Sequence, residues 1–204
     1  PVSGKNIYVV VYNERVGNLD ANEDKTFEVI GIDKLPLEKK MDVVDFNDNG
    51  LKSFVKFCTR FCFNAGQLTS GTYKSSDGVY TIEYLPTIVY PNGRESSTPA
   101  RIGVESGIIQ VSQAKFRPMT VPMRMAILLH EYSHFYVNDK MHDETEADLN
   151  GLLIYLGLGY PRIEAYQSFL TTFINVPSQQ NKDRYDKINK FIQDFEKNNY
   201  LVYE

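Results

Sequence analysis

The clearest chemical signal in the chain is the run His130-Glu131-Tyr132-Ser133-His134. On a helix, residues four positions apart lie on the same face, with β-carbons about 5–6 Å from each other. Both imidazoles can therefore reach one ion, and zinc accepts histidine nitrogens at about 2.0–2.1 Å. The carboxylate of Glu131 then lies where it can take a proton from a water molecule on that ion. The pattern predicts a hydrolytic zinc site with His130 and His134 as ligands and Glu131 as the general base.

Histidines in a helix can also be ordinary core residues whose ring nitrogens bond backbone carbonyls. That interpretation suits a lone histidine, but for His130 and His134 with Glu131 beside the first of them we favour the metal site. A catalytic zinc ion takes three protein ligands and keeps one position for water. A third ligand must therefore come from elsewhere in the chain.

The motif lies in a segment with the features of a buried helix. Thr120 can cap the free amides of the first turn, and Pro122 suits that turn because its missing amide hydrogen is harmless there. Two stripes at helical spacing follow, Met123, Ile127, His130, His134 and Val137 on one and Leu128, Tyr132 and Phe135 on the other. We therefore predict a largely buried helix whose histidines face inward.

A second helical segment, residues 143–156, follows after a polar break at residues 138–142. A connection of about five residues favours an antiparallel pair of helices. The first turn of the second helix then passes close to His134, which lies near the end of the first. This turn is the natural source of the third ligand.

Acidic residues open this second segment. Asp143 and Glu146 have the spacing of a capping box, which would occupy both side chains with amide donors. Glu144 is left free to face the metal, and Asp148, one turn on, can accept a hydrogen bond from a ligand imidazole. We predict Glu144 as the third ligand, with Glu146, Asp148 and His142 as alternatives. Acids are also favoured in any first turn by the helix dipole, and that alternative stays open.

Together with the HExxH run, Glu144-Thr145-Glu146-Ala147-Asp148 resembles the gluzincin branch of the zincin metallopeptidases. In that branch a helix after HExxH carries a Glu ligand in the pattern ExxxD or ExxA(D/N). The resemblance covers residues 100–160. It implies that the two histidines and Glu144 bind zinc, that Glu131 is the general base, and that Asp148 supports a ligand imidazole.

The metzincin pattern HExxHxxGxxH fits badly, because Val137 and Lys140 stand where its glycine and third histidine would be. The interval between His134 and Glu144 is shorter than in many gluzincins, so the choice of third ligand depends on the fold. Residues 130–164 also resemble small peptidases encoded by tailed bacteriophages. Many zincins stabilise the oxyanion with a Tyr or His, and Tyr160 is a candidate for that role.

Length and composition favour one compact domain. With 204 residues, 42% of them hydrophobic and 13% aromatic, the chain can bury a sizeable core. We expect a single domain over residues 1–204, made of a strand-rich segment (1–48), a catalytic core (49–160) and a helical segment (161–204). Neither a membrane span nor an intact signal peptide is visible, which favours a cytoplasmic location, or the virion if a phage encodes the chain.

The formal net charge of −4 argues against nucleic acid or an anionic membrane as the main partner, because such binding relies on clustered Lys and Arg. Cys58 and Cys62 lie on the apolar stripe of a predicted helix at residues 51–63. A disulfide within one regular helix is geometrically poor, so we expect two buried thiols. Reduced thiols are usual in the cytoplasm.

The expected fold class is α+β and zincin-like, with a small mixed sheet packed on the HExxH helix and the Glu-bearing helix, and further helices at the C-terminal end. Predicted strands are residues 6–12, 26–32, 79–85, 101–104 and 107–112, with a loop or hairpin at 66–78 and a last helix at 179–198. We expect residues 107–112 to form an edge strand that can pair with an extended peptide; the alternative is a plain internal strand.

These patterns predict Zn²⁺-dependent hydrolysis of peptide bonds, with a peptide or protein as the substrate. Two other classes remain. One is a catalytically silent zinc-bearing protein with a structural or interaction role, such as a virion component, although a structural zinc site would not need Glu131. The other is a metal-free helical scaffold in which the motif is a coincidence. The sequence does not predict an oligomeric state.

Overall fold

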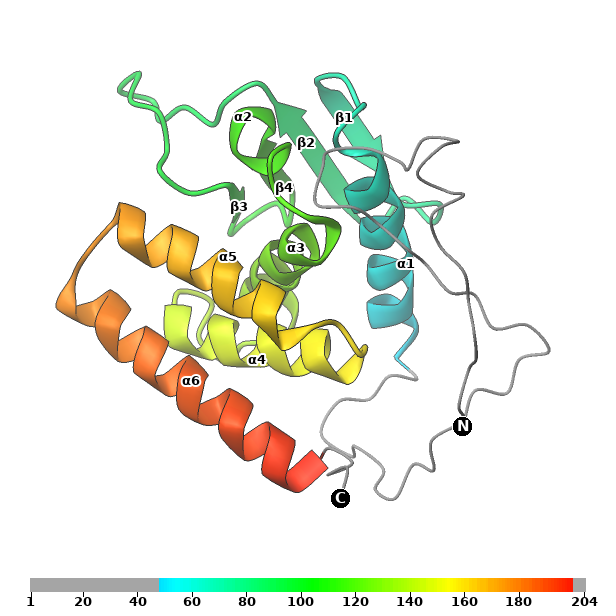
Figure 1. Ribbon diagram of the computed structural model, residues 1–204. Coiled ribbons are helices and arrows are strands. Elements are labelled where there is room, and N and C mark those ends of the chain that lie inside the picture. The colour runs from blue at the N-terminus through cyan, green and yellow to red at the C-terminus, as the bar shows by residue number, and fades with distance from the viewer. Residues whose placement is uncertain (1–47, 200–204) are drawn as a thin grey trace, which may run out of the picture.

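The computed structural model describes residues 48–199, and within them the chain forms six helices and a four-stranded mixed sheet (Figure 1). The helices are α1 (Asn49–Asn64), α2 (Gln113–Phe116), α3 (Val121–Tyr136), α4 (Glu144–Gly157), α5 (Arg162–Asn175) and α6 (Gln179–Asn199). The strands are β1 (Gly71–Lys74), β2 (Thr81–Leu85), β3 (Ala100–Ile102) and β4 (Ile109–Ser112). The predicted α+β class is confirmed for this part. The strands predicted at residues 6–12 and 26–32 lie outside the described residues.

The sheet has the order β1-β2-β4-β3. β1 and β2 form the hairpin expected near residues 66–78, β2 pairs with β4 in parallel, and β3 pairs with β4 antiparallel. The prediction that residues 107–112 form an edge strand is wrong, because β4 lies between β2 and β3; among the described strands, β3 lies at the edge. Ile109, Val111 and Ser112 are all buried. A mostly apolar run of this kind is typical of a strand inside a sheet, with a neighbouring strand on each side. The shorter β3 pairs with β4 alone.

Helix α3 lies at the centre of the fold and contacts α1, α4, α5 and β3. Figure 1 shows it enclosed by these elements. Its start follows the sequence prediction, since Thr120 caps the helix by accepting a 3.3 Å hydrogen bond from the Met123 amide and Pro122 lies in the first turn. Most of its residues are buried, so the expected inward-facing helix is confirmed.

Helix α4 runs back along α3 at very short range. A β-carbon built on Gly151 would lie 2.9 Å from both the amide nitrogen and the α-carbon of His130, closer than real side chains come. The backbones of α3 and α4 are therefore in direct contact at His130. Since α4 begins at Glu144 beside His134 and reaches His130 two turns later, the predicted antiparallel pair is confirmed.

Helix α1 covers α3 from the other side with the apolar face that the sequence predicts. Cys58 and Cys62 are both free and fully buried, and burial raises the pKa of each thiol. The buried guanidinium of Arg124 joins three elements, because it donates hydrogen bonds to the carbonyls of Cys62 (2.6 Å), Phe116 (3.0 Å) and Arg117 (2.8 Å). These bonds fix the start of α3 against α1 and α2.

The last two helices cover α3 and α4. α5 contacts α3, and α6 contacts both α4 and α5. The predicted last helix is confirmed as α6, which buries Ile188, Ile192 and Phe195. Among residues 48–199, none of the helices combines the length and the apolar character needed to cross a membrane.

Candidate metal centre

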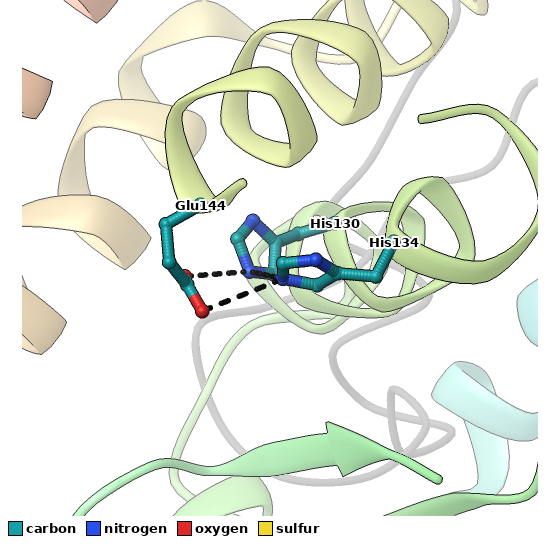
Figure 2. A group of neighbouring side chains, drawn as sticks. All are labelled: His130, His134 and Glu144. Atoms are coloured by element: carbon teal, nitrogen blue, oxygen red, sulfur yellow. Dashed lines mark hydrogen bonds and ion pairs between the residues drawn. The ribbon is translucent and has the colours of Figure 1, made fainter. Parts of the chain in front are cut away.

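Three side chains from two helices meet at one point (Figure 2). His130 and His134 lie one turn apart on α3, and their Nε2 atoms are 3.1 Å from each other. Glu144, the first residue of α4, presents one carboxylate oxygen to each ring, 3.5 Å from His130 Nε2 and 3.6 Å from His134 Nε2. The fold therefore brings together the three residues that the sequence predicts as ligands.

The neighbours of the two rings determine which nitrogens carry lone pairs. His134 Nδ1 lies 2.7 Å from the carbonyl oxygen of Met141, which can only accept, so this nitrogen donates. His130 Nδ1 lies 3.0 Å from Asp148 Oδ1, although the angle is not that of a hydrogen bond. With Nδ1 protonated on each neutral ring, both Nε2 atoms hold bare lone pairs directed at each other and at the Glu144 carboxylate. A positive charge between these atoms would stabilise the group.

A proton or a metal ion can supply that positive charge. Burial lowers the pKa of His130, but the adjacent carboxylates of Asp148 and Glu144 outweigh it and raise the pKa to about 10. The adjacent His130 ring lowers the pKa of Glu144 to about 2. Burial and the charge on His130 lower the pKa of His134. Without a metal, a proton on His130 thus supplies the positive charge that faces the Glu144 carboxylate.

The donor set fits a zinc ion. Two imidazoles and one carboxylate are the ligands of a well-known type of catalytic zinc site. Ligand atoms placed tetrahedrally at about 2.0–2.1 Å from zinc lie about 3.3 Å from one another. The separations of 3.1, 3.5 and 3.6 Å among the three side chains bracket that value. These three donor atoms could therefore form one face of a tetrahedron around a zinc ion.

Glu131 lies on the same turn of α3 as His130, but its carboxylate turns toward the sheet. Its Oε2 accepts a 2.8 Å hydrogen bond from the amide of Ile102 in β3. The side chain is only 8% exposed, and burial raises its pKa to about 7 despite the opposing effect of His130. β3 therefore fixes the carboxylate between the edge of the sheet and the histidine pair.

Sequence reasoning missed one residue of the site, Arg184 of α6. Its guanidinium bonds both oxygens of Asp148, at 2.7 and 2.9 Å, and lies 3.1 Å from Glu144 Oε2. Asp148 is 1% exposed and so has lost its hydration on folding. The two hydrogen bonds from Arg184 take the place of that hydration. A signal was present, because Arg184 is in line with the buried Ile188 and Ile192 on the apolar face of α6, where a solvated arginine is out of place.

The other predicted residues have different places. Asp143 caps α4 as expected, accepting a 3.0 Å bond from the Glu146 amide. Glu146 accepts hydrogen bonds from the amides of Asp139 and Lys140 in the loop, and not from the amide of Asp143. Only the Asp143 half of the predicted capping box is therefore formed. These bonds fix the loop that carries Met141 to His134.

Two predicted alternatives lie outside the cluster. His142 lines an open cavity beside the site and is not among the three converging ligands. Tyr160, the predicted oxyanion stabiliser, is not among the residues that line the two cavities at the cluster. Tyr160 follows the C-terminal end of α4, about 20 Å along the helix from Glu144 by helical rise. There it stacks on Tyr155, and its hydroxyl lies 3.5 Å from Thr59 Oγ1.

Two cavities meet at the cluster, and Glu131, His130 and Glu144 line both of them. The outer cavity, of about 360 Å³, opens over the edge strand between Tyr90 and His142. The apolar pocket, of about 90 Å³, lies between α3 and α5 and has Ala126, Ile127, Phe169 and Phe173 in its wall. The converging atoms are thus reachable from solvent, and an apolar side chain can be held beside them.

No protein-family model, no curated protein and no solved structure matches this chain. The functional interpretation therefore depends on the geometry of residues 130–148 and Arg184.

Proposed function

We propose that this protein is a zinc-dependent peptidase in which His130, His134 and Glu144 bind the metal and Glu131 is the general base. One observation carries the proposal: two imidazole lone pairs and a carboxylate converge within 3.1–3.6 Å at the junction of two solvent-connected cavities. The resemblance of the HExxH run and residues 144–148 to gluzincins points the same way. A purely structural zinc site usually has four protein ligands and no adjacent buried base.

A zinc ion held by these residues would supply Lewis acidity, lowering the pKa of a bound water molecule and polarising the scissile carbonyl. The protein residues divide the remaining tasks. His134 is held in one tautomer by the Met141 carbonyl, and His130 is oriented by Asp148, so both rings present Nε2. Arg184 holds Asp148 and Glu144 in place.

Glu131 has the position and the environment of a proton carrier. Burial raises the pKa of Glu131 above that of an ordinary glutamate, to about 7. Near neutral pH the side chain can therefore both accept a proton from water and release one to a leaving amine. The Ile102 amide holds one carboxylate oxygen and leaves the other to accept the proton. Peptide hydrolysis needs this two-way transfer, since water loses a proton and the leaving amine gains one.

The test separates metal binding from catalysis. Glu131→Gln keeps the shape of the side chain and removes the base, so we expect one zinc ion per chain and hydrolysis slower by about 100-fold or more. Zinc content by elemental analysis and cleavage of a mixed peptide library, with and without chelator, give the two readouts. Glu105→Gln, an exposed acid in the turn before β4, is the matched control and should behave as wild type.

If Glu131→Gln cleaves a responsive peptide as fast as wild type, the role of Glu131 is wrong. If zinc-loaded wild type cleaves no peptide in the library, the peptidase proposal fails, and a silent zinc-bearing protein becomes the better account.

A further inference from the structure

We propose that the site acts as an endopeptidase on an internal segment of an extended polypeptide; this inference rests on the function proposed above. Three observations support it: the cavities continue on both sides of the candidate metal centre, an edge strand borders them, and the charged groups that could hold a free chain end are already engaged.

The three cavities adjoin one another through shared lining residues. The outer cavity and the apolar pocket share His130, Glu131 and Glu144, so the candidate metal centre lies where they join. Beyond the apolar pocket, a third hollow of about 500 Å³ begins at Pro99, which lines both, and extends between α5 and residues 115–123. We call it the far groove. A substrate at the centre therefore has room to continue in both directions.

The edge strand β3 borders the outer cavity and the apolar pocket. In an antiparallel pair, alternate residues direct their amide and carbonyl groups away from the partner strand. Ile102 directs its amide away from β4, to Glu131, so Ala100 two residues earlier faces the same side. Ala100 lines both the outer cavity and the apolar pocket. Ala100 is only 2% exposed, so its main-chain groups can be reached only from within these cavities. An extended peptide that enters them can pair with Ala100 by main-chain bonds, which recognise the middle of a chain rather than its ends.

An aminopeptidase needs an acid that can hold the substrate's ammonium group. Within the described residues, the acids lining the outer cavity and the apolar pocket are Glu131, Glu144 and Asp148. Glu131 accepts the Ile102 amide, Glu144 faces the two imidazoles, and Asp148 is fully buried against Arg184. None of the three is left to bind a chain terminus.

A carboxypeptidase needs a cation for the terminal carboxylate. Among the described residues, the two arginines that line these cavities each contact other groups of the protein, Arg101 less completely than Arg184. Arg184 is bonded to Asp148 and Glu144. Arg101 donates to Gln110 Oε1 at 2.8 Å and lies over the ring of Tyr90, 5.3 Å from its centre. Among the described residues, the acids and arginines that line the outer cavity and the apolar pocket thus have partners within the protein, which favours internal cleavage.

The reaction consumes one water molecule. The internal C–N bond breaks, the oxygen of water joins the carbonyl carbon to make a new carboxylate, and a proton passes through Glu131 to the leaving amine. Both products are peptides of several residues, whereas an exopeptidase would release a single terminal residue.

The experiment uses zinc-loaded full-length protein and one peptide library in two forms. One form has free ends, and the other is N-acetylated and C-amidated; mass spectrometry identifies the products. We expect both forms to be cleaved at internal bonds with no loss of rate on blocking. Cleavage of the free-ended form alone, with release of single residues, would overturn the inference and leave the proposed function intact. Absence of cleavage in both forms would remove the proposed function itself.

A variant tests the far groove separately. Thr171 is exposed on α5 and lines that groove, so Thr171→Trp obstructs it without disturbing the core. We expect slower cleavage of a peptide long enough to fill all three cavities and an unchanged rate for one that ends at the apolar pocket. Gln193→Trp, exposed on α6, is the control. An unchanged rate for the long peptide would overturn the assignment of the far groove to the substrate path.

Discussion

At the residue scale, the site depends on groups that act through others. Each imidazole has an oxygen next to Nδ1, the Met141 carbonyl for His134 and the Asp148 carboxylate for His130. Asp148 in turn depends on Arg184, which supplies a bidentate partner from α6. Arg184 of α6 thus holds Asp148 of α4, and Asp148 in turn orients the His130 ring on α3.

The first prediction concerns Arg184. Arg184→Met keeps the length and packing of the side chain but leaves the buried Asp148 carboxylate without its guanidinium. We expect zinc affinity to fall by about 10–100-fold, the usual effect of losing an outer partner of a ligand. Competition with a chromophoric chelator measures it, and Lys187→Met, an exposed cation on the same helix, is the control. Equal affinity in Arg184→Met and wild type would contradict this role.

The second prediction concerns the apolar pocket. Its volume of about 90 Å³ is smaller than the roughly 150 Å³ of an engineered cavity that binds benzene, so it suits an aliphatic side chain better than an aromatic one. Ala126→Val narrows the pocket and Phe169→Leu widens it. We expect the preference for Leu over Ala beside the cleaved bond to fall in the first variant and rise in the second, each by about tenfold. Shifts in the same direction, measured from cleavage products, would show that this pocket does not receive the side chain.

At the element scale, the close approach of α4 to α3 determines where Glu144 lies. Gly151 allows the backbones to touch at His130, and a β-carbon there would collide with backbone atoms that cannot move aside. The position of the third ligand therefore depends on a glycine seven residues away on the same helix.

The third prediction follows from this contact. In an open helical position, Ala in place of Gly stabilises by about 0.5–1 kcal/mol. At Gly151 we expect the opposite sign, a loss of about 1–3 kcal/mol in the free energy of unfolding, because the helices must separate. Urea denaturation measures it. Gly71→Ala, with no atom within 4 Å of the added methyl, is the control and should change stability by less than about 0.5 kcal/mol. A stabilised Gly151→Ala variant would contradict the close packing.

Sequence patterns predicted the helices better than the sheet. For α3 and α4, the spacing of the apolar residues and the capping residue at the start are both encoded within a few neighbouring positions of the sequence. Thr120 and Asp143 are the two capping residues. The edge position of a strand is a property of pairing with distant segments, and residues 107–112 look alike in sequence whether one neighbour or two are present. The sequence therefore predicted a strand there but not its place in the sheet.

At the scale of the whole molecule, the site combines residues that are close in the sequence with residues that are distant in the sequence. Residues 130–148 form one helical hairpin, so spacing predicted that His130 and His134 would meet an acid from the start of the second helix, and it favoured Glu144 over Glu146, Asp148 and His142. Arg184 comes from a helix 36 positions beyond Asp148, and Ile102 from a strand 29 positions before Glu131. Only the packing of α6 and β3 against the hairpin brings these two to the centre.

Tyr160 shows the same limit from the other direction. It is close to Glu144 in sequence, but the length of α4 carries it to the opposite end of the helix, where it packs near α1. Nearness in sequence predicts nearness in space within a turn or two of helix, and not across a whole element.

The most direct test is a crystal structure of zinc-loaded protein with an anomalous difference map at the zinc edge. We predict one strong peak per chain between His130 Nε2, His134 Nε2 and the Glu144 carboxylate, at about 2.0–2.2 Å from each donor atom. A map with no peak among these three side chains, or a peak coordinated by Glu146 or His142 in place of Glu144, would contradict the account.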